Sequence, residues 1–158
     1  KLHDWVPLAA AQKEISLGVR KPDDAALARA KDILAKAPNQ FPRLKGMDEI
    51  YARETVQMAD YPDRVEVILQ ALRLGDLAIT AIPCEVFVEI GLELKARNPF
   101  PASFTISLAN GYNGYLPTPQ HHTLGGYETW RAKSSYLEAN ASPQITAVLF
   151  DLLGQLKK

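Results

Sequence analysis

The sequence predicts a mixed α/β fold of the α+β kind, in which helices cover a core made mostly of β-sheet. Two runs rich in β-branched and apolar residues, 65–74 and 77–82, flank the turn pair Gly75-Asp76 and predict an antiparallel hairpin. Segments with apolar residues at helical spacing lie before and after this hairpin. With 158 residues, the chain is long enough to bury the core of one domain.

The first part of the chain, residues 1–63, is expected to be a helical N-terminal segment. Residues 9–17 are expected to form a short helix. A second helix starts at Lys21-Pro22-Asp23-Asp24, because proline and acidic residues favour the first helical turn, and it ends at Pro38. A third helix is expected over 48–59. We interpret these helices as packing elements that carry no chemistry.

The second part of the chain alternates strands and helices. Pro83 closes the hairpin, and a helix is expected from Glu85 to about Ala96. The apolar run 104–109 predicts a buried strand. Ser142-Pro143 predicts the start of a C-terminal helix, because serine caps helix N-termini and proline suits the first helical position.

Composition excludes several classes of protein. The chain has 18 basic and 18 acidic residues, so it lacks the basic excess of a nucleic-acid-binding protein. No run of eighteen apolar residues predicts a membrane span. Cys84 is the only cysteine and therefore cannot form an internal disulfide. The chain opens at Lys1 without a methionine, so no compartment is inferred from the lack of a signal peptide.

Residues 108–128 have the most unusual composition in the chain. They contain three tyrosines, four glycines, two prolines and the pair His121-His122. Asn-Gly pairs and prolines end regular structure, so a long loop is expected to leave the preceding strand. Such loops are where a rigid scaffold tends to place its functional groups. The alternative is a turn whose tyrosines only cover the edge of the core.

Two motifs resemble a known family. NGYNGYLPTP followed by GGYE, with the strand-Pro-Cys-Glu unit over 81–87 upstream, resembles the C-terminal part of the catalytic domain of neutral/alkaline ceramidases. The resemblance is closer to the bacterial ceramidase-like members and runs from about Val65 to the C-terminus. It implies that residues 64–158 are the C-terminal portion of a larger catalytic domain, packed with residues 1–63 in one compact unit.

The resemblance assigns roles to three residues. Glu85 and Tyr115 fall on positions that ligate the catalytic zinc in the family. Tyr127 falls on the tyrosine that binds the substrate carbonyl as it becomes an oxyanion. From the residues alone, an ordinary glutamate in a first helical turn is the favoured interpretation of Glu85, and the resemblance assigns no role to Tyr112, which is expected to be a packing residue.

Three further residues are expected to have no role in the site. Cys84 stands where family members often have glycine, and we expect it to be small and buried. Adjacent histidines in an extended segment point to opposite faces, so His121 and His122 are expected to be surface loop residues.

The implied function is a zinc-dependent amidohydrolase of sphingolipid metabolism that hydrolyses an N-acyl amide, such as a ceramide-like lipid. The family's two histidine ligands lie upstream of the matching region, and His3 sits in no matching motif. The missing N-terminal part of the domain, or another chain, is therefore expected to complete the site and to cover an open strand edge and an apolar face. Family members are secreted, periplasmic or membrane-peripheral. The alternative is a non-catalytic scaffold or partner-binding domain, in which Glu85 and Tyr115 would not converge.

Overall fold

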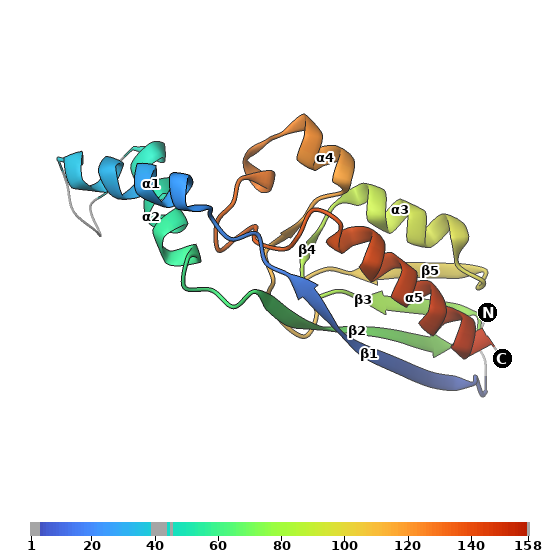
Figure 1. Ribbon diagram of the computed structural model, residues 1–158. Coiled ribbons are helices and arrows are strands. Elements are labelled where there is room, and N and C mark those ends of the chain that lie inside the picture. The colour runs from blue at the N-terminus through green and yellow to red at the C-terminus, as the bar shows by residue number, and fades with distance from the viewer. Residues whose placement is uncertain (1–3, 39–43, 45, 158) are drawn as a thin grey trace.

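The fold is a four-stranded sheet with helices packed on one face (Figure 1). The structure, a computed structural model, describes residues 4–38, 44 and 46–157. The sheet has the order β1-β2-β3-β5, formed by β1 (Leu8–Gly18), β2 (Arg64–Leu74), β3 (Leu77–Ala81) and β5 (Ala102–Ile106). Strands β1, β2 and β3 are antiparallel, as the hairpin prediction required for β2 and β3. Strand β5 runs parallel to β3 after a crossover through α3 (Val88–Arg97). The mixed α/β prediction is confirmed.

Strand β1 shows that the short helix expected over 9–17 was wrong, and that residues 1–63 are not wholly helical. Every residue of β1 pairs with β2, from Leu8 opposite Leu74 to Gly18 opposite Arg64. This pairing joins the whole length of β1 to the sheet, and Leu17 is buried; tertiary pairing of this kind overrides local helix propensity. The proposed division of the chain at residue 63 stays a prediction.

Helix α5 (Ala141–Lys157) covers one face of the sheet and confirms the predicted C-terminal helix. It packs against β1 and β2, while α3 packs against β5 (Figure 1). The side chains that meet in this layer are almost fully buried: Val67, Leu69, Ala71, Ile145, Leu149, Leu152 and Leu153. The hydrophobic core therefore lies between β2 and α5.

The described residues leave much of the opposite face of the sheet exposed. Ile68, Leu74, Phe104 and Ile106 point to this face and are 39–49% exposed. The buried strand expected over 104–109 was therefore wrong in two respects: β5 spans 102–106, and it is the edge strand of a half-open sheet.

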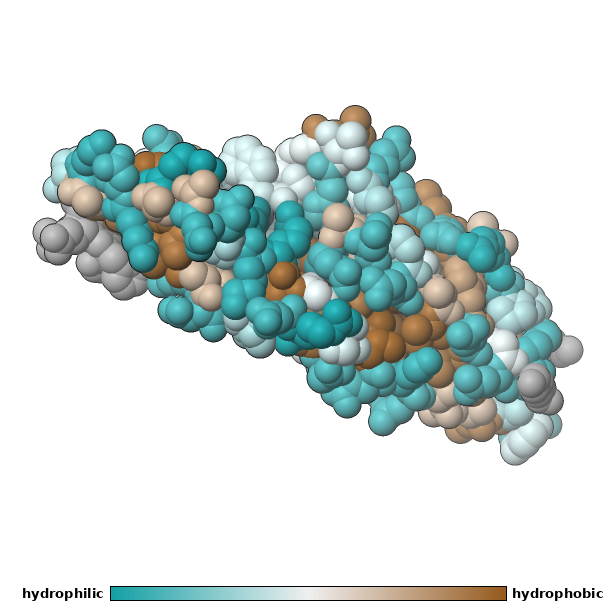
Figure 2. Space-filling view, viewed as in Figure 1, coloured by the Kyte–Doolittle hydropathy of each residue, from teal (hydrophilic) through white to brown (hydrophobic). Residues whose placement is uncertain are grey.

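Two helices form an arm between β1 and β2. Helices α1 (Asp24–Lys36) and α2 (Met47–Met58) pack on each other and extend away from the sheet (Figure 1). Asp23 caps α1, because its Oδ1 accepts a hydrogen bond of 2.6 Å from the backbone N–H of Ala26. In Figure 2 the visible hydrophobic side chains gather mostly over the sheet and its helices, and the arm is largely hydrophilic on this side.

A second, two-stranded sheet lies at the end of the first. It pairs β4 (Glu85–Val86) with β6 (Tyr115–Leu116) in parallel. The helix expected to begin at Glu85 begins instead at Val88, with Phe87 as its N-cap. Backbone N–H groups explain the shift: Glu85 donates to the Gly114 carbonyl and Val86 to Ser107 Oγ, which holds both residues extended.

The segment after β6 contains more structure than the expected loop. It forms the short helix α4 (Pro119–Leu124) and the 3₁₀ helix η1 (Tyr127–Thr129). Thr118 caps α4, and Pro119 occupies its first turn. Gly125 and Gly126 follow with positive φ, which reverses the chain direction and brings η1 back over β6.

Candidate functional site

Glu85 and Tyr115 lie directly opposite each other in the β4–β6 pair. Side chains of register partners on neighbouring strands project from the same face, so the carboxylate and the phenol are neighbours. Both residues are half-buried, and both strands are anchored in the core through Cys84 and Leu116. The structure thus brings together two residues that lie thirty positions apart in the chain and that come from separate motifs.

Tyr127 completes the group from η1. Its ring lies edge-to-face on that of Tyr115, with ring centroids 5.9 Å apart. A hydrogen bond to Tyr127 is the main cause that raises the pKa of Tyr115 to about 12, followed by desolvation and the negative charges of Glu85 and Glu128. In the absence of a cation, Tyr115 is therefore a neutral phenol at physiological pH.

Glu85 and Tyr115 border a hollow of about 350 Å³ at the end of the sheet. Its lining consists of Glu85, Val86, Phe87, Ser107, Leu108, Tyr115 and Glu128. Two carboxylates and a phenol therefore converge on one space, which is a donor set suited to a divalent cation. Glu128 is a candidate residue that the sequence analysis missed, although it directly follows Tyr127.

Tyr112 also has more than the packing role expected for it. Its hydroxyl donates a hydrogen bond of 3.2 Å to Glu85 Oε1, and the residue is 55% exposed. One carboxylate oxygen of Glu85 is thus held by Tyr112, which fixes the direction of the other. The motif NGYNGY therefore supplies Tyr112, which hydrogen-bonds to Glu85, and Tyr115, which lies opposite Glu85 in the β4–β6 pair.

Cys84 is fully buried, as expected from its position beside the site. Burial raises the pKa of its thiol to about 12. Its carbonyl oxygen accepts hydrogen bonds from Ser107 Oγ (2.8 Å) and from the Leu108 N–H (2.9 Å). The side chain fills the core and its backbone anchors the segment that precedes Glu85.

The two histidines lie on α4 rather than in an irregular loop, and both are half-buried. His121 Nδ1 is 2.8 Å from Thr118 Oγ1, and its Nε2 is 3.6 Å from Glu89 Oε1. Desolvation and the charge of Arg20 lower the pKa of His122. Among residues 4–38, 44 and 46–157, no three His, Cys, Asp or Glu side chains cluster as a metal site.

Arg20 positions the segment that carries Tyr127, and sequence reasoning missed it. Its guanidinium donates to the carbonyls of Thr129 (2.8 Å) and Leu137 (2.9 Å), and to the carbonyl and hydroxyl of Ser135 (2.7 and 2.9 Å). The Ser135 hydroxyl in turn donates to the Glu128 carbonyl. Burial lowers the pKa of Arg20, with the charge of Arg131 as the second cause. No local sequence signal distinguishes this arginine from others, because its partners lie more than a hundred residues away.

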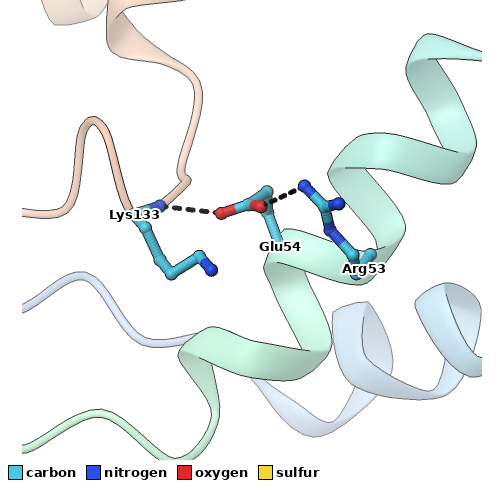
Figure 3. A network of polar contacts seen from close by, with 3 residues as sticks. All are labelled: Arg53, Glu54 and Lys133. Carbon is cyan, nitrogen blue, oxygen red and sulfur yellow. Dashed lines mark hydrogen bonds and ion pairs between the residues drawn. The ribbon is translucent and has the colours of Figure 1, made fainter. Parts of the chain in front are cut away.

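The helical arm contacts the same segment. Glu54 of α2 is almost buried; its Oε1 pairs with Arg53 Nη2 at 2.7 Å, and its Oε2 accepts a hydrogen bond of 3.1 Å from the backbone N–H of Lys133 (Figure 3). The rings of Tyr51 and Trp130 also pack edge-to-face, 5.1 Å apart. The arm therefore contacts the chain directly after η1, at Trp130 and Lys133.

The chain is similar in fold to part of two solved structures. No family model and no curated protein matches the chain. Among solved structures, the chain is similar to neutral ceramidase from Pseudomonas aeruginosa, with a TM-score of 0.59 and 13% sequence identity over 96% of this chain. It is also similar to a ceramidase complexed with C2, with a TM-score of 0.51 and 16% identity over 78% of this chain.

These matches confirm, at the level of fold, the resemblance that the two motifs indicated. The chain spans 28% and 21% of the lengths of the two solved proteins, so the shared fold is that of a part of each. Within the described residues, no helix is both long enough and apolar enough to cross a bilayer.

Proposed function

We propose that this chain is part of a ceramidase-like hydrolase that cleaves an N-acyl amide with the help of a zinc ion. Two independent features support the proposal. The fold resembles part of neutral ceramidase. The residues that the sequence motifs assigned to the site, Glu85, Tyr115 and Tyr127, converge on one hollow or beside it.

The pairing of Glu85 with Tyr115 is the observation that carries the proposal. The scaffold alternative requires no convergence of these two residues, since each could serve packing alone. Their register is instead fixed by β4 and β6, and Tyr112 adds a hydrogen bond to Glu85. The hydrogen bond to Tyr127, desolvation and the charges of Glu85 and Glu128 all raise the pKa of Tyr115, so a phenolate at this position would need a cation beside it.

The donor set fits zinc in part. Carboxylate oxygen is an ordinary zinc ligand, and a divalent cation would lower the pKa of Tyr115 and favour its phenolate form. A catalytic zinc usually has three or more protein ligands, so Glu85 and Tyr115 would hold it from one side only. When bound, zinc supplies an activated water and polarises the amide carbonyl.

Tyr127 would act on the substrate itself. Tyr127 is 55% exposed and its ring lies beside that of Tyr115, so its hydroxyl could reach a bound amide. A fixed O–H donor stabilises the negative charge that develops on the carbonyl oxygen during attack. The Arg20–Ser135 network would position Tyr127 by holding the Glu128 and Thr129 carbonyls.

The remaining ligands are proposed to come from the rest of a longer protein or from a second chain. The solved proteins are more than three times as long as the region that matches. The uncovered face of the sheet, with Ile68, Leu74, Phe104 and Ile106, would provide the apolar surface for this contact.

Zinc titration and amide hydrolysis test the proposal on the full protein that contains this chain. We expect Glu85→Ala and Tyr115→Phe each to weaken zinc binding by about tenfold or more. The matched control is Tyr127→Phe, which should leave zinc affinity unchanged and lower kcat for a short N-acyl amide by about a hundredfold. Zinc binding that is indifferent to both Glu85→Ala and Tyr115→Phe would favour the scaffold alternative.

A further inference from the structure

The chain contains two Asn-Gly pairs, Asn110-Gly111 and Asn113-Gly114, which lie three residues apart in the loop before β6. An asparagine followed by glycine is the pair most prone to deamidation, because glycine has no Cβ to keep its backbone nitrogen away from the asparagine side chain. In neither pair does the glycine N–H have a hydrogen-bond acceptor within the described residues. A difference between the two pairs must therefore come from the asparagine side chains and their surroundings.

Asn113 is held in place by hydrogen bonds on both sides of its amide. Its Nδ2 donates a hydrogen bond of 3.1 Å to the Pro83 carbonyl, and its Oδ1 accepts one of 2.7 Å from the Tyr136 hydroxyl. Its backbone N–H donates to the same Pro83 carbonyl at 2.8 Å. Asn113 is half-buried and Gly114 is buried. Attack of the Gly114 nitrogen on this side chain would require both side-chain hydrogen bonds to break inside the fold.

Asn110 is exposed and has one side-chain hydrogen bond within the described residues. Its Nδ2 donates to Gln70 Oε1 at 2.7 Å on the protein surface. The backbone is strained here, because Leu108 and Asn110 both have positive φ, 56° and 65°, and a bulky leucine rarely adopts this conformation. Strain of this kind lowers the cost of opening the turn locally, so the Gly111 nitrogen can approach the Asn110 side chain.

We propose that Asn110 is a site of spontaneous deamidation in the folded protein and that Asn113 is protected from it. The Gly111 nitrogen attacks Asn110 Cγ and forms a new N–Cγ bond. The bond from Cγ to the side-chain nitrogen breaks, and that nitrogen leaves as ammonia with the proton of the Gly111 N–H. A water molecule then opens the cyclic imide at either carbonyl carbon, which leaves aspartate or isoaspartate at position 110. Nothing is oxidised or reduced in these steps.

The fold can accommodate aspartate at position 110. Gln70 Nε2 donates to Gln12 Oε1 at 3.0 Å, so Asn110, Gln70 and Gln12 form one chain of amides from the loop across β2 to β1. A carboxylate cannot donate to Gln70, but rotation of the Gln70 and Gln12 amides reverses both hydrogen bonds, and the carboxylate then accepts. The product that carries aspartate should therefore keep the stability of the wild type near neutral pH.

Isoaspartate should change the structure locally. It adds a carbon atom to the main chain just before Gly111, where an added Cβ would lie 3.4 Å from Pro83 Cβ. The displacement reaches Tyr112, whose hydroxyl donates to Glu85 at 3.2 Å. Deamidation is thus linked to the candidate site through Tyr112. An effect on zinc rests on the proposed function, but the deamidation itself does not.

The test is peptide mapping by mass spectrometry on the full protein that contains this chain, incubated at physiological temperature and mildly alkaline pH. Fragment ions assign the amide-to-acid mass change to position 110 or 113 and distinguish isoaspartate from aspartate. The same protein unfolded in denaturant is the reference, since both Asn-Gly pairs are then free of tertiary contacts. Asn110→Gln is the matched variant, because glutamine keeps the amide but forms a cyclic imide much more slowly.

We expect both asparagines to deamidate at similar rates in the unfolded protein, and Asn110 to react about tenfold or more faster than Asn113 in the folded protein. Folded Asn110→Gln should show no deamidation in this loop on the same timescale. Equal rates at the two positions in the folded protein, a faster reaction at Asn113, or no reaction at Asn110 while the unfolded protein deamidates would each overturn the proposal.

Tyr136→Phe tests why Asn113 is protected. The variant removes the hydroxyl that donates to Asn113 Oδ1, so deamidation at Asn113 should accelerate about fivefold while the rate at Asn110 stays unchanged. No acceleration at Asn113 would show that its hydrogen bonds do not protect it. Because the readout is a mass change, the result is independent of whether the protein hydrolyses an amide.

Discussion

The two halves of the candidate site are held in place by different means. Glu85 and Tyr115 are fixed by backbone hydrogen bonds: the Glu85 N–H donates to the Gly114 carbonyl at 2.9 Å, and the Tyr115 N–H donates to the Ser134 carbonyl at 2.8 Å. Tyr127 is fixed mainly by the side chains of Arg20 and Ser135, which bind the backbone around it. The proposed metal-binding half is thus part of the sheet framework, and the proposed substrate-binding half is attached to it by side chains. A mutation that disrupts one half should therefore leave the structure of the other half intact.

The largest effect on stability is expected at Gly114, in the half that is held by backbone hydrogen bonds. Its φ is +72°, and a Cβ would lie 2.4 Å from the Ser134 carbonyl oxygen. Gly114→Ala should lower the free energy of unfolding by about 3 kcal/mol or more, because strain and a backbone clash add. Denaturant unfolding measures this loss.

Gly125→Ala is the matched control for that change. Gly125 has a similar φ of +85°, but a Cβ added there would meet no atom within 4 Å. Its φ and ψ of +85° and −163° lie in a region nearly exclusive to glycine, so we expect a backbone cost of about 1–3 kcal/mol without an added clash. Equal losses at the two positions would show that the close approach of Ser134 does not fix β6.

Arg20→Met should destabilise the segment around Tyr127, which is held by side-chain hydrogen bonds. The change removes four hydrogen bonds and leaves the carbonyls of Thr129, Ser135 and Leu137 without this donor, so we expect a loss of about 2–3 kcal/mol in unfolding free energy. Hydrogen exchange should accelerate over 127–137 and remain unchanged in β2. Zinc affinity should also persist, and its loss would show that the two halves are coupled. Arg20→Lys should recover part of the stability, since an ammonium can satisfy some of the same carbonyls.

Tyr136→Phe should have the smallest effect on stability. It tests a core hydrogen bond that supports the half held by backbone hydrogen bonds. The Tyr136 hydroxyl donates to Asn113 Oδ1 at 2.7 Å, and Asn113 in turn donates to the Pro83 carbonyl, close to both β4 and β6. We expect a loss of about 1 kcal/mol near neutral pH, measured by denaturant unfolding.

The same variant should change the pH dependence of stability. Burial raises the pKa of Tyr136 from 10.0 to about 12. Because the unfolded chain loses this proton first, the contribution is fully present below pH 10 and falls as the pH rises toward 12. The wild type should therefore lose stability more steeply than Tyr136→Phe over this interval. Parallel curves would contradict the buried, protonated state of Tyr136.

Local patterns predicted the elements that depend on local chemistry. The turn at Gly75-Asp76 appears where the sequence placed it, and α1 begins at Asp24, within the predicted helix entry. Helix α5 begins at Ala141, one residue before the predicted start, so Ser142 lies inside the helix and is not its cap. Strand β1 was missed because its alanines, lysine and glutamate favour a helix in isolation, and only pairing with β2 makes it a strand. The exposure of β5 was missed because a sequence does not reveal which strand lies at the edge of a sheet.

The sequence predicted residues of the candidate site but not how they are arranged in space. The motifs identified Glu85, Tyr115 and Tyr127, yet the parallel register of β4 and β6 depends on contacts between distant segments. Glu85 does not lie in a first helical turn, since α3 starts only at Val88. Arg20 could not have been found, because its role arises from carbonyl groups that the fold brings to it.

The place where the helical arm leaves the sheet has a consequence for how such proteins can diverge. The arm departs after Gly18 and returns at Arg64, and these residues are direct partners in the β1–β2 ladder. Because the two attachment points are adjacent, insertions in the arm that leave Arg20, Tyr51 and Glu54 in place cost little beyond loop-closure entropy, while the register of the sheet is kept. The arm is thus a position for evolutionary insertion beside the candidate site, where new sequence can reshape the surface near Tyr127 without rebuilding the core.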